Sequence, residues 1–164
     1  MRIAQLRQYD IANGPGVRMT IFVSGCTHNC KGCFNTLYKN FSYGEEMSVE
    51  KGFEIIKMIK DDNVQGVTIL GGEPFDQDEE LLTLVSNIIH MTGKRIWIYS
   101  GYTFEQLMKK PLARKILSFC DVLIDGPFIE ELKDPRLKFR GSSNQRIIDV
   151  QTSLELGNPV PYIF

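Results

Sequence analysis

The chain has 164 residues, of which 43% are hydrophobic and 24% charged, and its formal net charge at pH 7 is −1. This length suits one domain with a substantial core, so we expect residues 1–164 to form a single domain. The even charge balance excludes the strongly basic composition of bulk nucleic-acid or membrane-surface binders. The N-terminus has no apolar run of signal-peptide length, and no run of about 20 apolar residues occurs, so we expect a cytoplasmic protein.

Four short apolar runs, each ending in glycine, predict the strands of one sheet. They are rich in β-branched residues and nearly continuous in hydrophobicity, which is typical of parallel strands covered on both faces. In chain order they are 20-TIFVSG-25, 67-VTILGG-72, 96-IWIYSG-101 and 122-VLIDG-126. They define a βαβ core at 20–126, after a leading segment at 1–19 and before C-terminal strands and a tail at 127–164.

Amphipathic patterns between these runs predict helices. Ser48 is expected to cap the first helix. Asp76 and Thr103 are each followed three residues later by Glu or Gln, the signature of a capping box at the second and third helices. Pro111 is expected to break or restart the third helix. The apolar positions are Phe53, Ile55, Ile56 and Ile59 in the first helix and Leu81, Leu82, Val85, Ile88 and Ile89 in the second.

Strands that alternate with helices predict right-handed βαβ units in one mostly parallel sheet, an α/β fold. A complete (β/α)8 barrel needs about 250 residues, so only an incomplete barrel fits this chain. Ligands of such sheets bind at the carboxyl ends of the strands. Glu73, Ser100 and Asp125 fall at these ends, and the cysteine loop that follows the first strand lies at the same edge.

Three of the four cysteines, Cys26, Cys30 and Cys33, lie in 26-CTHNCKGCFN-35 with the spacing C-x3-C-x2-C. In a reducing compartment, clustered cysteines indicate a metal or redox site rather than a disulfide. A [4Fe–4S] cluster normally has four cysteine ligands, so three leave one iron open to a small molecule. We therefore expect a [4Fe–4S] cluster on these three residues.

Two other readings of the loop stay open. His28 could join the three cysteines in a zinc site, although it lies closer to Cys26 and Cys30 than zinc ligands usually do. Cys30 and Cys33 could form a thiol–disulfide pair, which would leave Cys26 unexplained. The fourth cysteine, Cys120, precedes an apolar run and is expected to be a buried structural residue.

The second strand ends in 70-LGGEP-74. Gly71 and Gly72 would let the backbone approach a ligand closely, and Pro74 would stop the strand. Glu73 presents a carboxylate suited to an ammonium group. On its own the motif is weak, because two glycines before a helix are often only a turn.

These motifs resemble the radical S-adenosylmethionine (radical SAM) superfamily, in which C-x3-C-x2-C is followed by a GGE-type strand end. The segment 13-NGPGVR-18 is similar to the start of the glycyl-radical-enzyme activases. The stretches CTHNCKGCFN, IYSGYTFE, DVLIDGPFIEE and FRGSSNQRIIDV further resemble the activating proteins of anaerobic ribonucleoside-triphosphate reductases. The resemblance runs from about residue 5 to residue 153, nearly the whole chain.

The resemblance implies that the three clustered cysteines hold the [4Fe–4S] cluster and that S-adenosylmethionine (SAM) chelates its fourth iron. It implies that the Gly71–Glu73 element orients the amino group of SAM. Gly32, Cys33 and Phe34 would lie along the adenosine. Many superfamily members carry a bulky residue at the position of Gly32, so Phe34 is expected to supply the aromatic contact. Ser100 and Asp125 are expected to contact the ribose or the carboxylate.

The activity that the resemblance implies is the reductive cleavage of SAM to a 5′-deoxyadenosyl radical, which takes hydrogen from a glycine of the large subunit of the anaerobic reductase. A low-potential electron donor is therefore expected, together with the reductase as partner and no nucleic acid or membrane. No side chain is expected to act as acid or base, because the cofactors carry the chemistry. The open side of an incomplete barrel would admit the partner's loop.

Three other functions stay open: an activase for another glycyl radical enzyme, a cysteine-rich zinc module that binds a protein, and a thiol oxidoreductase.

His28 is expected to be a polar loop residue, and His90 a residue at the end of a helix. The basic stretch 133–146 could be a solvated face or a docking surface. Arg18 could fix a turn or meet the partner, and the apolar tail 158–164 could be a strap or could cover a sheet edge.

Overall fold

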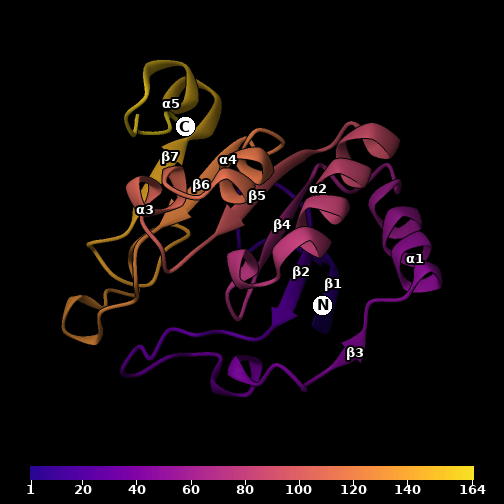
Figure 1. Ribbon diagram of the computed structural model, residues 1–164, viewed down its shortest axis with the longest axis horizontal. Coiled ribbons are helices and arrows are strands. Elements are labelled where there is room, and N and C mark those ends of the chain that lie inside the picture. The colour runs from indigo at the N-terminus through magenta and orange to yellow at the C-terminus, as the bar shows by residue number, and fades with distance from the viewer.

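Seven strands form one sheet in the order β3-β1-β2-β4-β5-β6-β7 in the computed structural model, which describes all 164 residues (Figure 1). The four predicted apolar runs are β2, β4, β5 and β6, and they pair in parallel as predicted. The flanking strands β1, β3 and β7 are antiparallel, so the sheet is mixed. The bounds are β1 Arg2–Asp10, β2 Arg18–Ser24, β3 Glu45–Glu46, β4 Gly66–Gly71, β5 Arg95–Tyr99, β6 Val122–Asp125 and β7 Arg146–Asp149.

The helices follow most of the predicted signals. The Ser48 side chain caps α1 by accepting a hydrogen bond from the Lys51 amide. Thr103 and Gln106 form a complete capping box at α3, and Pro111 is the first residue of α4. The bounds are α1 Val49–Ile59, α2 Asp78–Thr92, α3 Phe104–Met108, α4 Pro111–Leu117 and α5 Val150–Leu156, with 3-10 helices η1 Thr36–Lys39, η2 Pro74–Asp76 and η3 Glu130–Leu132. No helix has the length and apolar character needed to cross a membrane.

Two details of the helix prediction are wrong. Asp76 does not cap α2, because it is the last residue of the short helix η2, which starts at Pro74. The helix α2 begins at Asp78, and its N-cap residue Gln77 makes no side-chain capping hydrogen bond. The Asp76 carboxylate faces the cysteine loop instead. Phe53 is not part of the apolar face of α1, since it is 63% exposed while Ile55 is fully buried.

Helices cover only one face of the sheet. The larger core cluster joins alternate strand residues such as Ile21, Ile69 and Ile98 to buried residues of α1, α2 and α4. These helices lie together on one side of the strands in Figure 1. A smaller cluster around Trp97 and Ile124 occupies the other face. The strands are therefore buried on both sides as predicted, but by different layers.

The C-terminal tail covers the β7 edge. Val160 accepts from the Asp149 amide, and the Tyr162 amide donates to Ile147. The rings of Tyr162 and Phe164 then pack on Trp97, with centroids 5.4 and 6.2 Å away. The tail is thus both a strap and an edge cover, the two roles considered for it.

Arg18 lies buried at the amino end of β2, far along the strand from the cysteine loop. Its Nε donates to Thr68 Oγ1 at 2.7 Å, its Nη2 to the Val67 carbonyl at 2.7 Å, and its guanidinium lies 5.4 Å from the centre of the Trp97 ring. Burial lowers the pKa of Arg18 to about 10. Because the side chain is enclosed and also reaches Pro15, it fixes the turn before β2.

Candidate functional site

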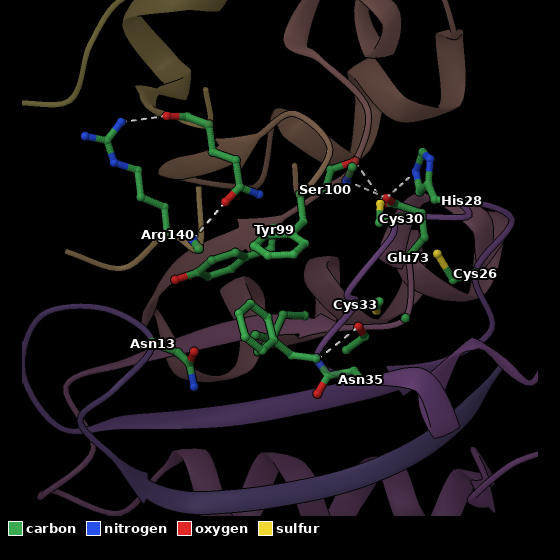
Figure 2. A pocket seen from close by; sticks show the side chains of 18 of the residues that line it. Asn13, Cys26, His28, Cys30, Cys33, Asn35, Glu73, Tyr99, Ser100 and Arg140 are labelled. Carbon is green, nitrogen blue, oxygen red and sulfur yellow. Dashed lines mark hydrogen bonds and ion pairs between the residues drawn. The ribbon is translucent and has the colours of Figure 1, made fainter. Parts of the chain in front are cut away.

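A cavity of about 500 Å³ lies at the carboxyl ends of the parallel strands, a size within the usual range for small-molecule sites (Figure 2). All three clustered cysteines line it, together with residues of the strand ends and of the segment 126–145. Figure 2 shows the cysteines on one side of the cavity with Glu73, while Arg140 lies across from them. The predicted convergence of the cysteine loop and the strand ends is therefore present.

The cysteines suit an iron–sulfur centre by their chemistry and placement. Cys26, Cys30 and Cys33 are free thiols, half-buried, and face one cavity. Burial raises the pKa of Cys26 to about 11, with the carboxylates of Glu73 and Asp76 adding to the rise and the His28 amide opposing it. Cys120 is fully buried in the core, as predicted, and its burial raises the pKa of its thiol.

In the zinc interpretation of this loop, His28 would be the fourth ligand beside the three cysteines. His28 instead donates from Nε2 to Glu73 Oε2 at 2.9 Å, and this hydrogen bond is the main reason that the pKa of His28 is raised. His28 is thus the polar loop residue that was expected. His90 lies at the end of α2, also as expected.

The two glycines of the GGEP motif are required by the approach of other backbone segments. A Cβ on Gly71, whose φ is +122°, would lie 2.5 Å from the Val23 carbonyl oxygen. A Cβ on Gly72 would lie 2.4 Å from the Gly25 carbonyl oxygen. The end of β4 is therefore pressed against the start of the cysteine loop, and both glycines also line the cavity.

Glu73 lines the cavity and joins three elements there. It is 1% exposed, and its Oε1 accepts from the Phe75 amide at 3.0 Å and Ser100 Oγ at 2.9 Å. Its Oε2 accepts from the Gly101 amide at 2.7 Å and from His28. A carboxylate has about four lone-pair sites, so the chain itself supplies a full set of donors. Glu73 thereby holds β4, β5 and the cysteine loop together.

Gly32 and Phe34 occupy different positions beside Cys33. Gly32 has φ +71°, a left-handed backbone conformation that favours glycine, and this accounts for the lack of a bulky residue at this position. Gly32 does not line the cavity, whereas Phe34 does. The Phe34 ring is 62% exposed and packs against Phe128 with centroids 4.8 Å apart. It is therefore available at the cavity rim.

Ser100 and Asp125 are not equivalent. Ser100 lines the cavity, although its hydroxyl donates to Glu73. Asp125 does not line it: the carboxylate accepts from the Phe104 amide at 2.6 Å and from Arg146 Nε at 2.9 Å. Asp125 therefore anchors α3 and β7, and the next residue, Gly126, takes its place at the cavity.

The cavity also contains residues that sequence reasoning missed. The Tyr99 hydroxyl donates to the Phe139 carbonyl at 2.6 Å and so ties the segment 126–145 across the open face of the sheet. Phe139 has φ +57°, a left-handed conformation that is rare for a bulky residue. Arg140 and Asn13 line the cavity as well. The FRGSSNQR motif pointed to this segment, but no local pattern indicated that it crosses the sheet.

The basic residues of the stretch 133–146 differ in their surroundings. Arg146 pairs with Asp125 and Glu105, and Arg136 pairs with Asp134. Lys133 lies 5.0 Å from the centre of the Phe34 ring. Lys133, Arg136 and Lys138 are exposed, as expected of a solvated face, whereas Arg146 is partly buried in its ion pairs.

Comparison with known proteins gives a consistent result. The family described as "4Fe-4S single cluster domain" matches residues 12–148. The chain is 42% identical over 152 residues to the anaerobic ribonucleoside-triphosphate reductase-activating protein of Haemophilus influenzae, covering 90% of this chain and 97% of the relative. It is 40% identical over 152 residues to the protein of that name from Pasteurella multocida, covering 90% and 96%. It is 37% identical over 150 residues to the protein of that name from Escherichia coli K12, and the alignment covers 88% of this chain and 96% of the relative.

The cluster-domain match spans most of the chain, and the alignments with these relatives extend over nearly the whole of both partners. The match includes the cysteine loop, the GGEP strand end and the segment that crosses the cavity. The chain therefore belongs to the 4Fe–4S family of anaerobic ribonucleoside-triphosphate reductase-activating proteins.

Proposed function

We propose that this protein activates an anaerobic ribonucleoside-triphosphate reductase by generating a glycyl radical on its large subunit. The observation that carries the proposal is that three free cysteines and the GGEP strand end line one cavity at the carboxyl ends of the strands. The names of the relatives support the choice of partner. An activase for another glycyl radical enzyme would use the same cavity, and only the relatives favour the reductase.

Cys26, Cys30 and Cys33 would hold the [4Fe–4S] cluster, since they are the only cysteines that line the cavity. With SAM bound, a cluster held by these cysteines would supply the electron for the reductive cleavage of SAM to methionine and a 5′-deoxyadenosyl radical. Low-potential clusters reach about −700 mV, so a strongly reducing electron donor is needed. The protein's part is to bind, orient and shield these groups.

The backbone of Gly71 and Gly72 would receive the amino group of SAM. The Glu73 carboxylate already has four donors, so we assign it the role of holding this backbone rather than of binding the ammonium directly. Phe34 lies at the rim next to Cys33 and would face the adenosine, with the backbone at Gly32 setting its direction. Ser100 is suited to the ribose side of the cavity.

The partner's glycine must reach the cavity on a loop of protein chain. The helices cover one face of the sheet and the cavity lies at the other, which fits an incomplete barrel with an accessible side. Aromatic and aliphatic side chains, Phe22, Leu70 and Tyr99 among them, line that side. An apolar wall would keep water from a reactive carbon radical.

The test is anaerobic reconstitution followed by electron paramagnetic resonance of the dithionite-reduced protein, with and without SAM. We expect a [4Fe–4S] signal that changes shape when SAM is added. Replacing Cys26, Cys30 or Cys33 by alanine should abolish it, and Cys120→Ser should retain it as the matched control. A colourless protein holding one zinc ion would refute the proposal and favour the zinc-binding module.

A glycyl-radical signal from the large subunit of the reductase, after mixing with the reduced protein and SAM, would identify the partner. If SAM alters the cluster signal but the reductase acquires no radical, SAM binding at the cluster stands and the reductase is rejected as the partner. The cluster signal therefore tests the cofactor, and the glycyl-radical signal tests the choice of partner.

A further inference from the structure

Asp76 holds the backbone directly after Cys26. Its Oδ2 accepts from the Thr27 amide and from Thr27 Oγ1, both at 2.8 Å. Its Oδ1 accepts from the Tyr102 hydroxyl at 2.7 Å. One carboxylate thus joins the cysteine loop to the segment that follows β5, two regions about 75 residues apart in the chain.

A second layer of contacts makes this arrangement rigid. The Tyr102 ring packs edge-on against His28 with centroids 4.4 Å apart, and its hydroxyl lies 3.3 Å from Thr27 Oγ1. His28 is in turn bonded to Glu73. On the other side, the Cys26 amide donates to the Lys39 carbonyl at 3.1 Å. The backbone is therefore hydrogen-bonded both at Cys26 and at the residue that follows it.

The hydrogen bonds of the Asp76 carboxylate go to the cysteine loop and to Tyr102. The DxxE pattern predicts a helix cap, yet Asp76 caps nothing, and α2 starts at Asp78 without a side-chain cap. The Asp76 amide donates to the Glu73 carbonyl at 3.1 Å, so the 3-10 turn η2 sets the direction of the carboxylate. That direction is toward the cysteine loop.

The same geometry places negative charge beside the first cluster ligand. The Asp76 carboxylate accepts from the amide of Thr27, the residue directly after Cys26. Reduction adds an electron to a cluster, and local charge is one of the factors that set its potential. A carboxylate next to one ligand therefore makes reduction harder and the reduced cluster a stronger electron donor.

We propose that Asp76 is a positioning residue that fixes the Cys26 end of the loop and lowers the reduction potential of the bound cluster. The inference rests on the proposed function, because it assumes that Cys26 is a cluster ligand. Tyr102 and Thr27 orient the Asp76 carboxylate through hydrogen bonds but carry no charge themselves.

The main test is the midpoint potential of the reconstituted cluster, measured by a redox titration that is followed by electron paramagnetic resonance. In Asp76→Asn we expect a shift to more positive potential with the iron content unchanged. Glu79→Gln is the matched control, since it removes the same charge from an exposed residue of α2 and should leave the potential where it was. Tyr102→Phe loses one hydrogen bond but no charge and should shift the potential less than Asp76→Asn.

A second readout needs no cofactor. In the apo protein, iodoacetamide alkylates the Cys26 thiolate, and the rate is followed by mass spectrometry. Once the rate is corrected for the ionised fraction through its pH dependence, it reports how firmly the loop is held. We expect several-fold faster alkylation in Asp76→Ala, partial rescue in Asp76→Asn and no change in Glu79→Gln. Alkylation of buried Cys120 is the internal check that each variant is folded.

The outcomes separate this inference from the proposed function. An unchanged potential in Asp76→Asn with a full complement of iron, or an unchanged alkylation rate in Asp76→Ala, would overturn the role assigned to Asp76. If the unaltered protein takes up no cluster, the proposed function fails instead, and the tuning of potential fails with it. The alkylation rates would still decide whether Asp76 positions the loop.

Discussion

His28 and Gly101 lie so close together that residue 101 has no room for a side chain. A Cβ on Gly101 would come within 2.7 Å of both Cδ2 and Nε2 of the His28 ring. The Gly101 amide and the His28 ring also share one oxygen of Glu73. The turn after β5 and the cysteine loop thus fit together around a single buried carboxylate.

Gly101→Ala should therefore displace His28 and loosen the cysteine loop. We expect less iron per chain after reconstitution and faster alkylation of Cys26 in the apo protein. The matched control is Gly52→Ala in α1, where an added Cβ meets nothing within 4 Å. That variant should be stabilised by roughly 0.5–1 kcal/mol, because alanine is the better helix former, with iron uptake unchanged. Equal iron uptake in both variants would contradict the prediction.

Glu73→Gln should destabilise the apo protein. The amide offers one acceptor oxygen, while its NH2 group would face N–H and O–H donors that now bond to the carboxylate. An unsatisfied buried donor costs about 1–3 kcal/mol, so we expect a loss of that order in the free energy of unfolding, measured with urea. Glu155→Gln, on an exposed residue, should change it by less than about 0.5 kcal/mol. A Glu73→Gln variant as stable as the native chain would refute this view.

The ion pair between Glu105 and Arg146 predicts a pH dependence. Hydrogen bonding to Arg146 lowers the pKa of Glu105 from its ordinary 4.5 to about 2. Since the folded-state pKa is the lower one, the contribution to stability is complete above about pH 4.5 and is lost as the pH falls toward 2. The Glu105 side chain is 54% exposed, so solvent screens the pair and its contribution is on the order of 1 kcal/mol or less.

The measurement is the melting temperature of the native protein and of Glu105→Gln as a function of pH. The native protein should melt higher at pH 7, and the gap between the two should close as the pH falls below 4.5. Salt should narrow the gap at pH 7, because it screens exposed charges. A gap that persists at low pH would show that the side chain stabilises by packing instead.

Tyr99→Phe should free the segment that crosses the open face. The Tyr99 hydroxyl is the donor to the Phe139 carbonyl, and Phe139 is held in the left-handed region. Loss of this bond should cost about 0.5–1.5 kcal/mol and should raise hydrogen exchange of the amides at 137–141 in the apo protein. Tyr9→Phe, which removes an exposed bond to Asp61, is the control and should leave that exchange unchanged. Equal exchange in both variants would show that Trp97 packing alone holds Phe139.

The strands could be predicted because their signal is local. Each of β2, β4, β5 and β6 is a continuous apolar run, and a strand buried on both faces needs little else. The strand β1 escaped prediction because its sequence, RIAQLRQYD, mixes polar and apolar residues without a continuous run. It forms because β2 offers a neighbouring edge on which it pairs antiparallel.

The cysteine loop and the GGEP strand end could be predicted to meet at the carboxyl edge, since C-x3-C-x2-C and GGEP follow neighbouring strands in a βαβ order. Only the tertiary structure decided what each side chain does there. Glu73 accepts hydrogen bonds from residues 28, 75, 100 and 101. Asp125 accepts from Arg146, and Asp76 accepts from Thr27 instead of capping α2. A buried carboxylate takes whichever donors the packed chain brings within reach, and those donors come from segments far apart in sequence.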